Sequence, residues 1–140
     1  MMTREPIYTA LATLLSGIQG LTVSRRLKHW ADIPKSQQPI LFLVQKTETA
    51  VTQTGQPTRW TLHLDLYLYC HSTDPSVPPI TVANPILDSI SQVLDLPPAI
   101  GRQTLNGLVQ YCRIQGQIQT DEGVLDDQSV CIIPVEILTA

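Results

Sequence analysis

The feature that most constrains the fold is an uninterrupted alternation of apolar and polar side chains over residues 58–71. The apolar positions are Trp60, Leu62, Leu64, Leu66, Leu68 and Cys70, and the positions between them are Arg59, Thr61, His63, Asp65, Tyr67 and Tyr69. Successive side chains of a strand point to opposite faces, whereas a helix would spread these leucines around its circumference. The stretch therefore predicts a long β-strand with one apolar face.

The second face of this strand carries charges, an imidazole and two phenols. It is too polar for a dry core and more aromatic than an ordinary solvated face. We interpret it as a surface that contacts a partner, for which another copy of the chain is one candidate. The alternative is that the tyrosines pack on neighbouring strands of the same sheet.

The length and composition are typical of one globular domain spanning residues 1–140. Such a chain can bury a two-layer core without disulfides or metals. Charged residues make up 15% of the sequence, against an average of about a quarter. A surface short of charge indicates that part of it is covered by a partner.

Charge is distributed unevenly along the chain. The net charge is −3, so the composition gives no case for specific binding to nucleic acid. Residues 1–59 hold seven Lys/Arg and three Asp/Glu, a balance of +4, whereas residues 60–140 hold two and nine, a balance of −7. A polarised chain can place a positive patch against the negative patch of a neighbouring copy. Alternatively, the two halves interleave in the fold and the charges mix.

The three cysteines, Cys70, Cys112 and Cys131, fall in apolar, strand-like runs. Their odd number and position predict reduced, buried thiols in a cytoplasmic setting. The N-terminal segment lacks the charged n-region, apolar run and small-residue cleavage site of a signal peptide. No apolar run approaches membrane-spanning length, so we expect no membrane partner.

In the first half, Thr3 is a candidate helix cap before an apolar stripe at helical spacing, which ends at Gly17 or Gly20. Residues 21–30 read as a strand, 31–39 as a loop and 40–44 as a strand covered on both faces. A turn at residues 52–57 joins this strand to the alternating strand as a hairpin. The distal part, residues 45–59, has little to bury and is a candidate contact arm.

In the second half, a proline-rich loop at 72–79 precedes a second helix, capped by Thr81 or Asn84 and stopped at 96–98. Residues 108–120 and 129–139 read as strands on either side of an acidic turn at 121–127. Pro134 lacks a backbone donor, which predicts an edge position or a bulge in the last strand.

The resulting element order is α-β-β-β-α-β-β. The simplest arrangement is an α+β fold: a mostly antiparallel sheet of about five strands, with two helices on one face and one long projecting hairpin.

Three groups of residues are candidates for a chemical site. His63 and Asp65 could share a metal, but His71 lies far along the strand and no third ligand is evident, so cross-strand polar pairing is favoured. The carboxylates of the acidic turn do not have the spacing of an EF-hand loop. Cys70 and His71 are adjacent in a strand and point to opposite faces. We therefore predict no enzymatic activity, no cofactor and no metal site.

Several segments have the character of one protein family. They are residues 4–8 (REPIY), 24–30 (SRRLKHW), 66–69 (LYLY), 101–105 (GRQTL) and 121–123 (DEG). Together with the length and the element order, they resemble the tail terminator, or tail completion, proteins of tailed bacteriophages and prophages. The resemblance spans nearly the whole chain.

This resemblance implies structural work in virion assembly. Tail terminator proteins form a hexameric ring that caps the tail tube, ends its polymerisation and provides the head-joining surface, and they resemble the tube protein in fold. The implied partners are further copies of the chain, the tail tube protein and the head–tail connector protein. The implied location is the virion tail, assembled in the host cytoplasm. Two alternatives stay open: a head–tail connector or neck protein, and a small metal-binding domain built on His63 and Asp65.

Contacts around a ring are heterologous, so one patch of a subunit meets a different patch of its neighbour. We hypothesise that basic residues near the first strand, or Arg59, meet the acidic turn of the next copy. The residues predicted to form the interface are Arg25, Arg26, Lys28, Glu48, Arg59, Tyr67, Tyr69, Asp121, Glu122, Asp126 and Asp127.

Overall fold

The computed structural model describes residues 2–121 and 127–139. The helices are α1 (Arg4–Ser16) and α2 (Ile80–Leu94), with short 3-10 helices η1 (Trp30–Asp32) and η2 (Lys35–Gln37). The strands are β1 (Thr22–Ser24), β2 (Ile40–Val51), β3 (Arg59–His71), β4 (Val109–Ile114), β5 (Gln119–Asp121) and β6 (Gln128–Thr139). None of the helices in these ranges is long and apolar enough to cross a membrane.

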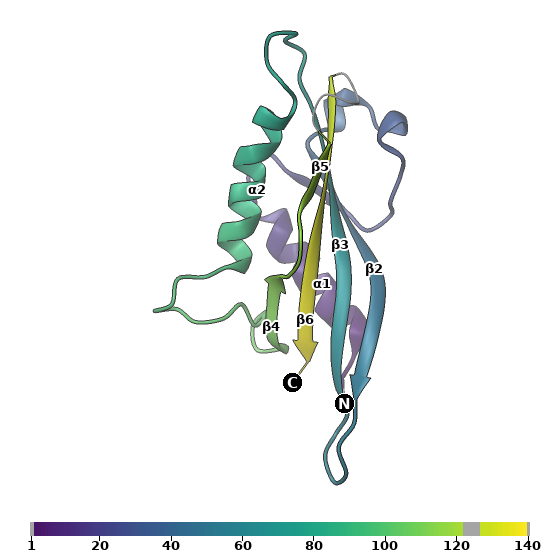
Figure 1. The fold of residues 1–140 in the computed structure, drawn as a ribbon, viewed down its shortest axis with the longest axis vertical. Helices are drawn as coiled ribbons and strands as arrows, with labels where there is room; N and C mark the ends of the chain where they lie inside the picture. Colours follow the sequence, from purple (N-terminus) through teal and green to yellow (C-terminus); the bar gives the residue numbers. More distant parts are fainter. Residues whose placement is uncertain (1, 122–126, 140) are drawn as a thin grey trace.

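The strands form one six-stranded sheet in the order β1-β2-β3-β6-β4, with β5 also paired to β6 (Figure 1). All pairings are antiparallel except that of β1 with β2. The predicted α+β class and mostly antiparallel sheet are confirmed, with six strands where about five were expected.

The alternating strand lies at the centre of the sheet, between β2 and β6. Its leucines at positions 62, 64, 66 and 68 are at most 1% exposed and pack against α1 and α2. The apolar stripe of α1 contributes Ile7, Leu11 and Leu15 to this core, and α2 contributes Ile90 and Leu94. Both helices therefore cover one face of the sheet, which leaves the opposite face without a helical layer.

The hairpin of β2 and β3 projects beyond the helices at one end of the molecule (Figure 1). The pairing shifts by one residue between Gln45 and Thr47, so Lys46 is an extra residue in a β-bulge. At the tip, Gln56 N–H donates to Gln53 O at 3.1 Å, and Gly55 takes a φ of +79° that a glycine adopts readily. The projecting hairpin is thus confirmed.

The strand predicted for residues 21–30 is wrong beyond Ser24. Arg25 to His29 are exposed and their side chains have no strand partner to bury against. The chain instead crosses the second face of the sheet and forms η1 and η2 inside the predicted loop. There Ile33 packs with Ile40, Phe42 and Tyr69 in a separate small core.

The strand predicted for residues 108–120 is interrupted. It divides into β4 and β5, which both pair with β6 and are separated by residues 115–118. The break lies opposite Pro134, where Gln115 N–H donates to Pro134 O. In an antiparallel pair the second hydrogen bond would come from the backbone N–H of residue 134, which proline lacks. Pro134 thus lies in the interior strand β6, so the prediction of an edge position is wrong. The neighbouring strand is interrupted between β4 and β5, where Pro134 cannot donate a hydrogen bond.

The predicted helix caps are also corrected. α2 begins at Ile80, one turn before Asn84, and its N-cap residue is Pro79. Thr81 lies inside the first turn, where its hydroxyl donates to Pro78 O at 2.6 Å. Thr3 is the N-cap residue of α1, but its side chain makes no capping hydrogen bond.

Candidate functional site

We use the term open face for the side of the sheet opposite the helices. Near the projecting hairpin, its side chains come from β2, β3, β4 and β6. They are Lys46, His63, Asp65, Tyr67, Tyr111, Arg113 and Glu136. Away from the hairpin, the segment with η1 and η2 covers the same side of the sheet.

Glu136 is the centre of the polar contacts on the open face. In the strand register, His63 of β3 and Arg113 of β4 lie directly opposite it. Glu136 accepts a hydrogen bond from Tyr111 Oη at 3.0 Å, and Arg113 Nη2 lies 3.5 Å from the same carboxylate oxygen. His63 Nε2 lies 4.0 Å from the other oxygen. Three strands are therefore cross-linked by one carboxylate whose side chain is only 16% exposed.

Lys46 forms a second polar group on the same face. Its ammonium lies 3.9 Å from Asp65 Oδ2 and 3.5 Å from Tyr67 Oη. The bulge at this residue lets it reach across to β3. His63 and Asp65 thus take part in cross-strand polar pairing, the interpretation that the sequence favoured. Exposed pairs of this kind add little to stability, roughly 0–1 kcal/mol each, so their main effect is to orient the side chains.

The three cysteine thiols are buried in the sheet. Burial raises the pKa of the Cys70 and Cys112 thiols to about 12, and it also raises the pKa of Cys131. Thiols with such pKa values stay protonated and unreactive at neutral pH. Burial and the hydrogen bond to Glu136 raise the pKa of Tyr111 as well.

His63 and Asp65 are also the candidate metal ligands of the sequence. Within residues 2–121 and 127–139, no group of three or more His, Cys, Asp or Glu side chains is arranged to hold a metal ion. The open face presents charged groups and aromatic rings, among them Lys46, Glu136 and Tyr67.

Two of the predicted interface residues are engaged within the chain. Arg25 Nη1 lies 2.6 Å from Glu5 Oε2, and its guanidinium also lies over the Tyr8 ring. Glu48 Oε1 accepts a hydrogen bond from Arg4 Nε at 2.8 Å, on the helix side of the hairpin. Both pairs link α1 to neighbouring segments, which gives these residues a role inside the subunit.

The basic residues Arg26, Lys28 and Arg59 are exposed. Arg59 lies at the start of β3, beside the hairpin tip. None of the three forms an ion pair with a described residue.

The two predicted tyrosines differ in their surroundings. Tyr69 is only 4% exposed, packs against Phe42 at 5.3 Å between ring centroids, and donates its hydroxyl to Lys28 O at 2.7 Å. Its side chain is part of the small second core and is not presented to a partner. Tyr67, two residues earlier, stays half-buried beside Lys46 on the open face.

The predicted acidic turn is only partly described. Asp121 ends β5 and is half-buried. Asp127 is ion-paired with Lys35, and its backbone carbonyl accepts a hydrogen bond from Ser72. Glu122 and Asp126 lie outside the described residues. The Lys35 contact joins the basic and acidic halves of the chain within one subunit.

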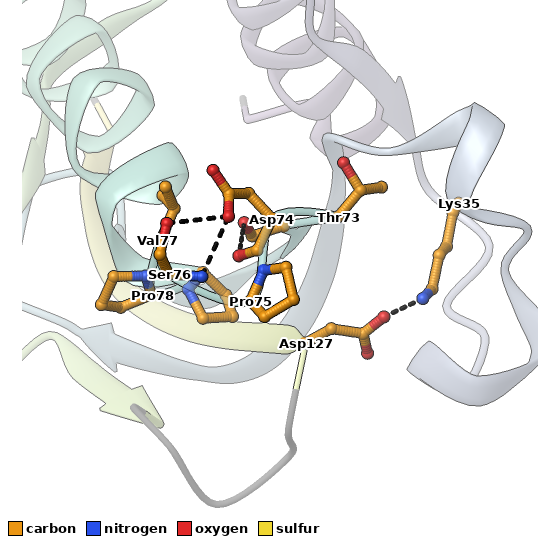
Figure 2. Close-up of a pocket in the computed structure, with 10 residues that line it drawn as sticks. Lys35, Thr73, Asp74, Pro75, Ser76, Val77, Pro78 and Asp127 are labelled. Atoms are coloured by element: carbon orange, nitrogen blue, oxygen red, sulfur yellow. Dashed lines mark hydrogen bonds and ion pairs between the residues drawn. The ribbon is translucent and has the colours of Figure 1, made fainter.

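A hollow of about 740 Å³ lies beside this ion pair, before the start of α2. Figure 2 shows Lys35 and Asp127 on one side and the proline-rich segment 72–79 on the other. Asp74 Oδ1 accepts from the backbone N–H and the hydroxyl of Ser76, and these bonds lower the pKa of its carboxyl. Ser72 and Ser76 thus contact Asp74, and Lys35 contacts Asp127, within the lining of the hollow.

Sequence reasoning missed Lys46, Tyr111, Arg113 and Glu136 as members of the surface. The available signal was the alternation in residues 129–139, which places Glu136 opposite the buried Val135 and Ile137. No protein-family model matches the chain, and a search of curated proteins finds no match.

Proposed function

We propose that this chain is a structural protein of a bacteriophage or prophage tail. In this proposal it forms a ring, of six copies by analogy with the family it resembles, which caps the tail tube, ends its polymerisation and provides the head-joining surface. The proposal starts from the resemblance carried by residues 4–8, 24–30, 66–69, 101–105 and 121–123. It concerns assembly and requires no catalytic group.

The observation that carries the proposal is the unpartnered end of the sheet. β1 pairs with β2 only over residues 40–42, so residues 43–51 have a neighbour on the β3 side alone among the described strands. The same end carries the open face and the projecting hairpin. An arm with little of its own to bury is suited to contact another molecule.

The bulge and the positive charge at Lys46 are consistent with a selective contact along this edge of the sheet. Bulges and lysines on edge strands disfavour indiscriminate pairing with any other exposed strand. A subunit that must assemble only with chosen partners benefits from both devices.

The test is capping of tail tubes, followed by electron microscopy of purified tubes mixed with the protein. A variant that replaces residues 52–58 with Asn-Gly joins Val51 to Arg59 by a two-residue turn, the loop length best suited to a hairpin. A control keeps seven loop residues but replaces their side chains with Ser and Gly. We expect the native protein to appear at tube ends and to limit tube growth.

We also expect the shortened variant to stay folded and to lose tube capping. Folded native protein that binds no tube end would contradict the tail-terminator proposal. Binding to the portal side of heads in place of tubes would instead favour the head–tail connector role.

A further inference from the structure

Five ion pairs neutralise much of the charge within the described part of the chain. They are Arg4–Glu48, Arg25–Glu5, Lys35–Asp127, Lys46–Asp65 and Arg113–Glu136. Among residues 2–121 and 127–139, the charged residues outside these pairs are Arg26, Lys28, Arg59 and Arg102, together with Asp32, Asp74, Asp88, Asp95 and Asp121. Asp74 accepts hydrogen bonds from Ser76 and Asp121 is half-buried, whereas the other seven are exposed.

Two of the unpaired basic residues lie apart from two of the unpaired acidic residues. Arg26 and Lys28 follow β1, the strand at one edge of the sheet. Asp88 and Asp95 belong to α2 and its C-cap, on the side of the molecule away from the β1–β2 edge (Figure 1). Arg26 and Lys28 thus lie apart from Asp88 and Asp95. Elsewhere the two halves of the chain meet, through the ion pairs Lys35–Asp127 and Lys46–Asp65.

The outer surface of α2 has an unusual charge pattern. No Lys or Arg occurs from Trp60 to Gly101. Asp88 and Asp95 are both exposed and lie seven residues apart, so they share the solvent face of the helix with the uncharged Asn84 and Gln92. The helix itself therefore carries two carboxylates and no cation, and the basic residue that follows it, Arg102, lines a hollow together with Asp95.

The negative charge of Asp95 also lies at the negative end of the helix dipole. It is the C-cap residue of α2, and the last turn contains no basic side chain. The C-terminal end of a helix carries partial negative charge, so a carboxylate there is destabilising and a cation is favoured. A basic group supplied by another molecule would relieve this unfavourable arrangement.

The segment after β1 has complementary chemistry. Arg26 and Lys28 flank Leu27, which is 42% exposed. An apolar side chain between two cations can bury hydrophobic area while the charges orient the contact. Leu87 on α2 is half-buried and offers an apolar surface beside the acidic stripe.

We propose that the outer face of α2, through Asp88 and Asp95, docks onto the Arg26–Leu27–Lys28 segment of a second copy of the chain. The contact is heterologous, because each copy uses a different patch on each of two sides. It deepens the proposed function and rests on it for the closure of the contacts into a ring.

The test uses two charge-reversed variants, D88K/D95K and R26E/K28E, in analytical ultracentrifugation at low and high salt. In the first variant both patches are basic, and in the second both are acidic, so each repels its own copies. We expect each alone to raise the dissociation constant of the contact roughly tenfold or more. We expect an equimolar mixture to assemble again, because each basic patch then meets an acidic one.

D88E/D95E and R26K/K28R are the matched controls, because they change the same side chains and keep the charge of each patch. Both should assemble like the native protein. Circular dichroism of every variant checks that the fold is retained.

The outcomes separate this contact from the function. Native protein that stays monomeric at all concentrations would overturn the contact, as would assembly that is unaffected by both double reversals. If both charge-reversed variants still form rings, the proposed contact is wrong and the ring proposal is unaffected. Assemblies that respond to the reversals but are not rings support the contact and count against the ring.

Discussion

At the scale of single residues, the structure assigns several charged side chains to partners that lie far away in the sequence. Arg25 meets Glu5, Glu48 meets Arg4, and Lys35 meets Asp127. These contacts link α1 to the sheet, and the segment after β1 to the beginning of β6. The residues outside such pairs, above all Asp88 and Asp95, carry the inferred contact between copies.

Asp95 allows a direct comparison of stability with assembly. Replacing it with Asn removes a carboxylate from the C-terminal end of α2, which should raise the free energy of unfolding by about 0.5 kcal/mol. Asp88→Asn, in the middle of the same helix, should change stability less. Urea unfolding measures both variants. A stability loss in Asp95→Asn would contradict the argument from the helix dipole.

The buried thiols predict a dependence of stability on alkaline pH. The pKa of Cys70 and of Cys112 is about 12 in the folded protein, against an ordinary value of 9.0. Between these values the folded chain holds protons that the unfolded chain has released, so the free energy of unfolding falls as pH rises. The stabilising contribution is complete below pH 9. Urea unfolding from pH 8 to 11 measures it, and a flat profile above pH 9 would contradict it.

At the scale of elements, the strands with strict alternation were predictable and the irregular segments were not. Residues 59–71 have the same inward-facing leucines that the sequence indicated. Residues 21–30 also alternate in part, but their outward positions are charged and only three residues form a strand. The alternation predicts which side chains can be buried. It does not predict whether a neighbouring strand is present to pair with that segment.

The candidate site was predicted in outline only. Alternation placed Tyr67 and Tyr69 on one face, but the segment that crosses this face buries Tyr69 and leaves Tyr67 half-buried. The coverage depends on Ile33, which lies in a segment without periodicity. The cross-strand contacts of Glu136 depend on the strand order, which local sequence patterns do not determine.

The central position of β3 predicts a severe effect of truncating its core side chains. Leu66 is fully buried in the middle of the strand, so Leu66→Ala should lower the free energy of unfolding by about 2–5 kcal/mol. Leu27→Ala, at a site that is 42% exposed, is the matched control and should cost much less. Thermal and urea unfolding compare the two. Equal losses would indicate that the helices do not cover this face in solution.

At the scale of the whole molecule, a two-layer fold places its helices on one face of the sheet, leaves the opposite face open, and extends a hairpin at one end. Arg26 and Lys28 lie beside one sheet edge, and Asp88 and Asp95 lie on α2 and at its C-cap. Two different complementary patches on one chain favour head-to-tail association, which closes into a ring when the rotation per subunit allows it.

The central claim is that copies of this chain assemble into a closed ring. We would measure the mass in solution by light scattering behind size exclusion at several concentrations, and image the largest species by negative stain. The account predicts a discrete species of about six subunits with a central hole, weakened by salt because charged patches hold it together. A monomer at every concentration, both alone and with tail tubes, would contradict the account.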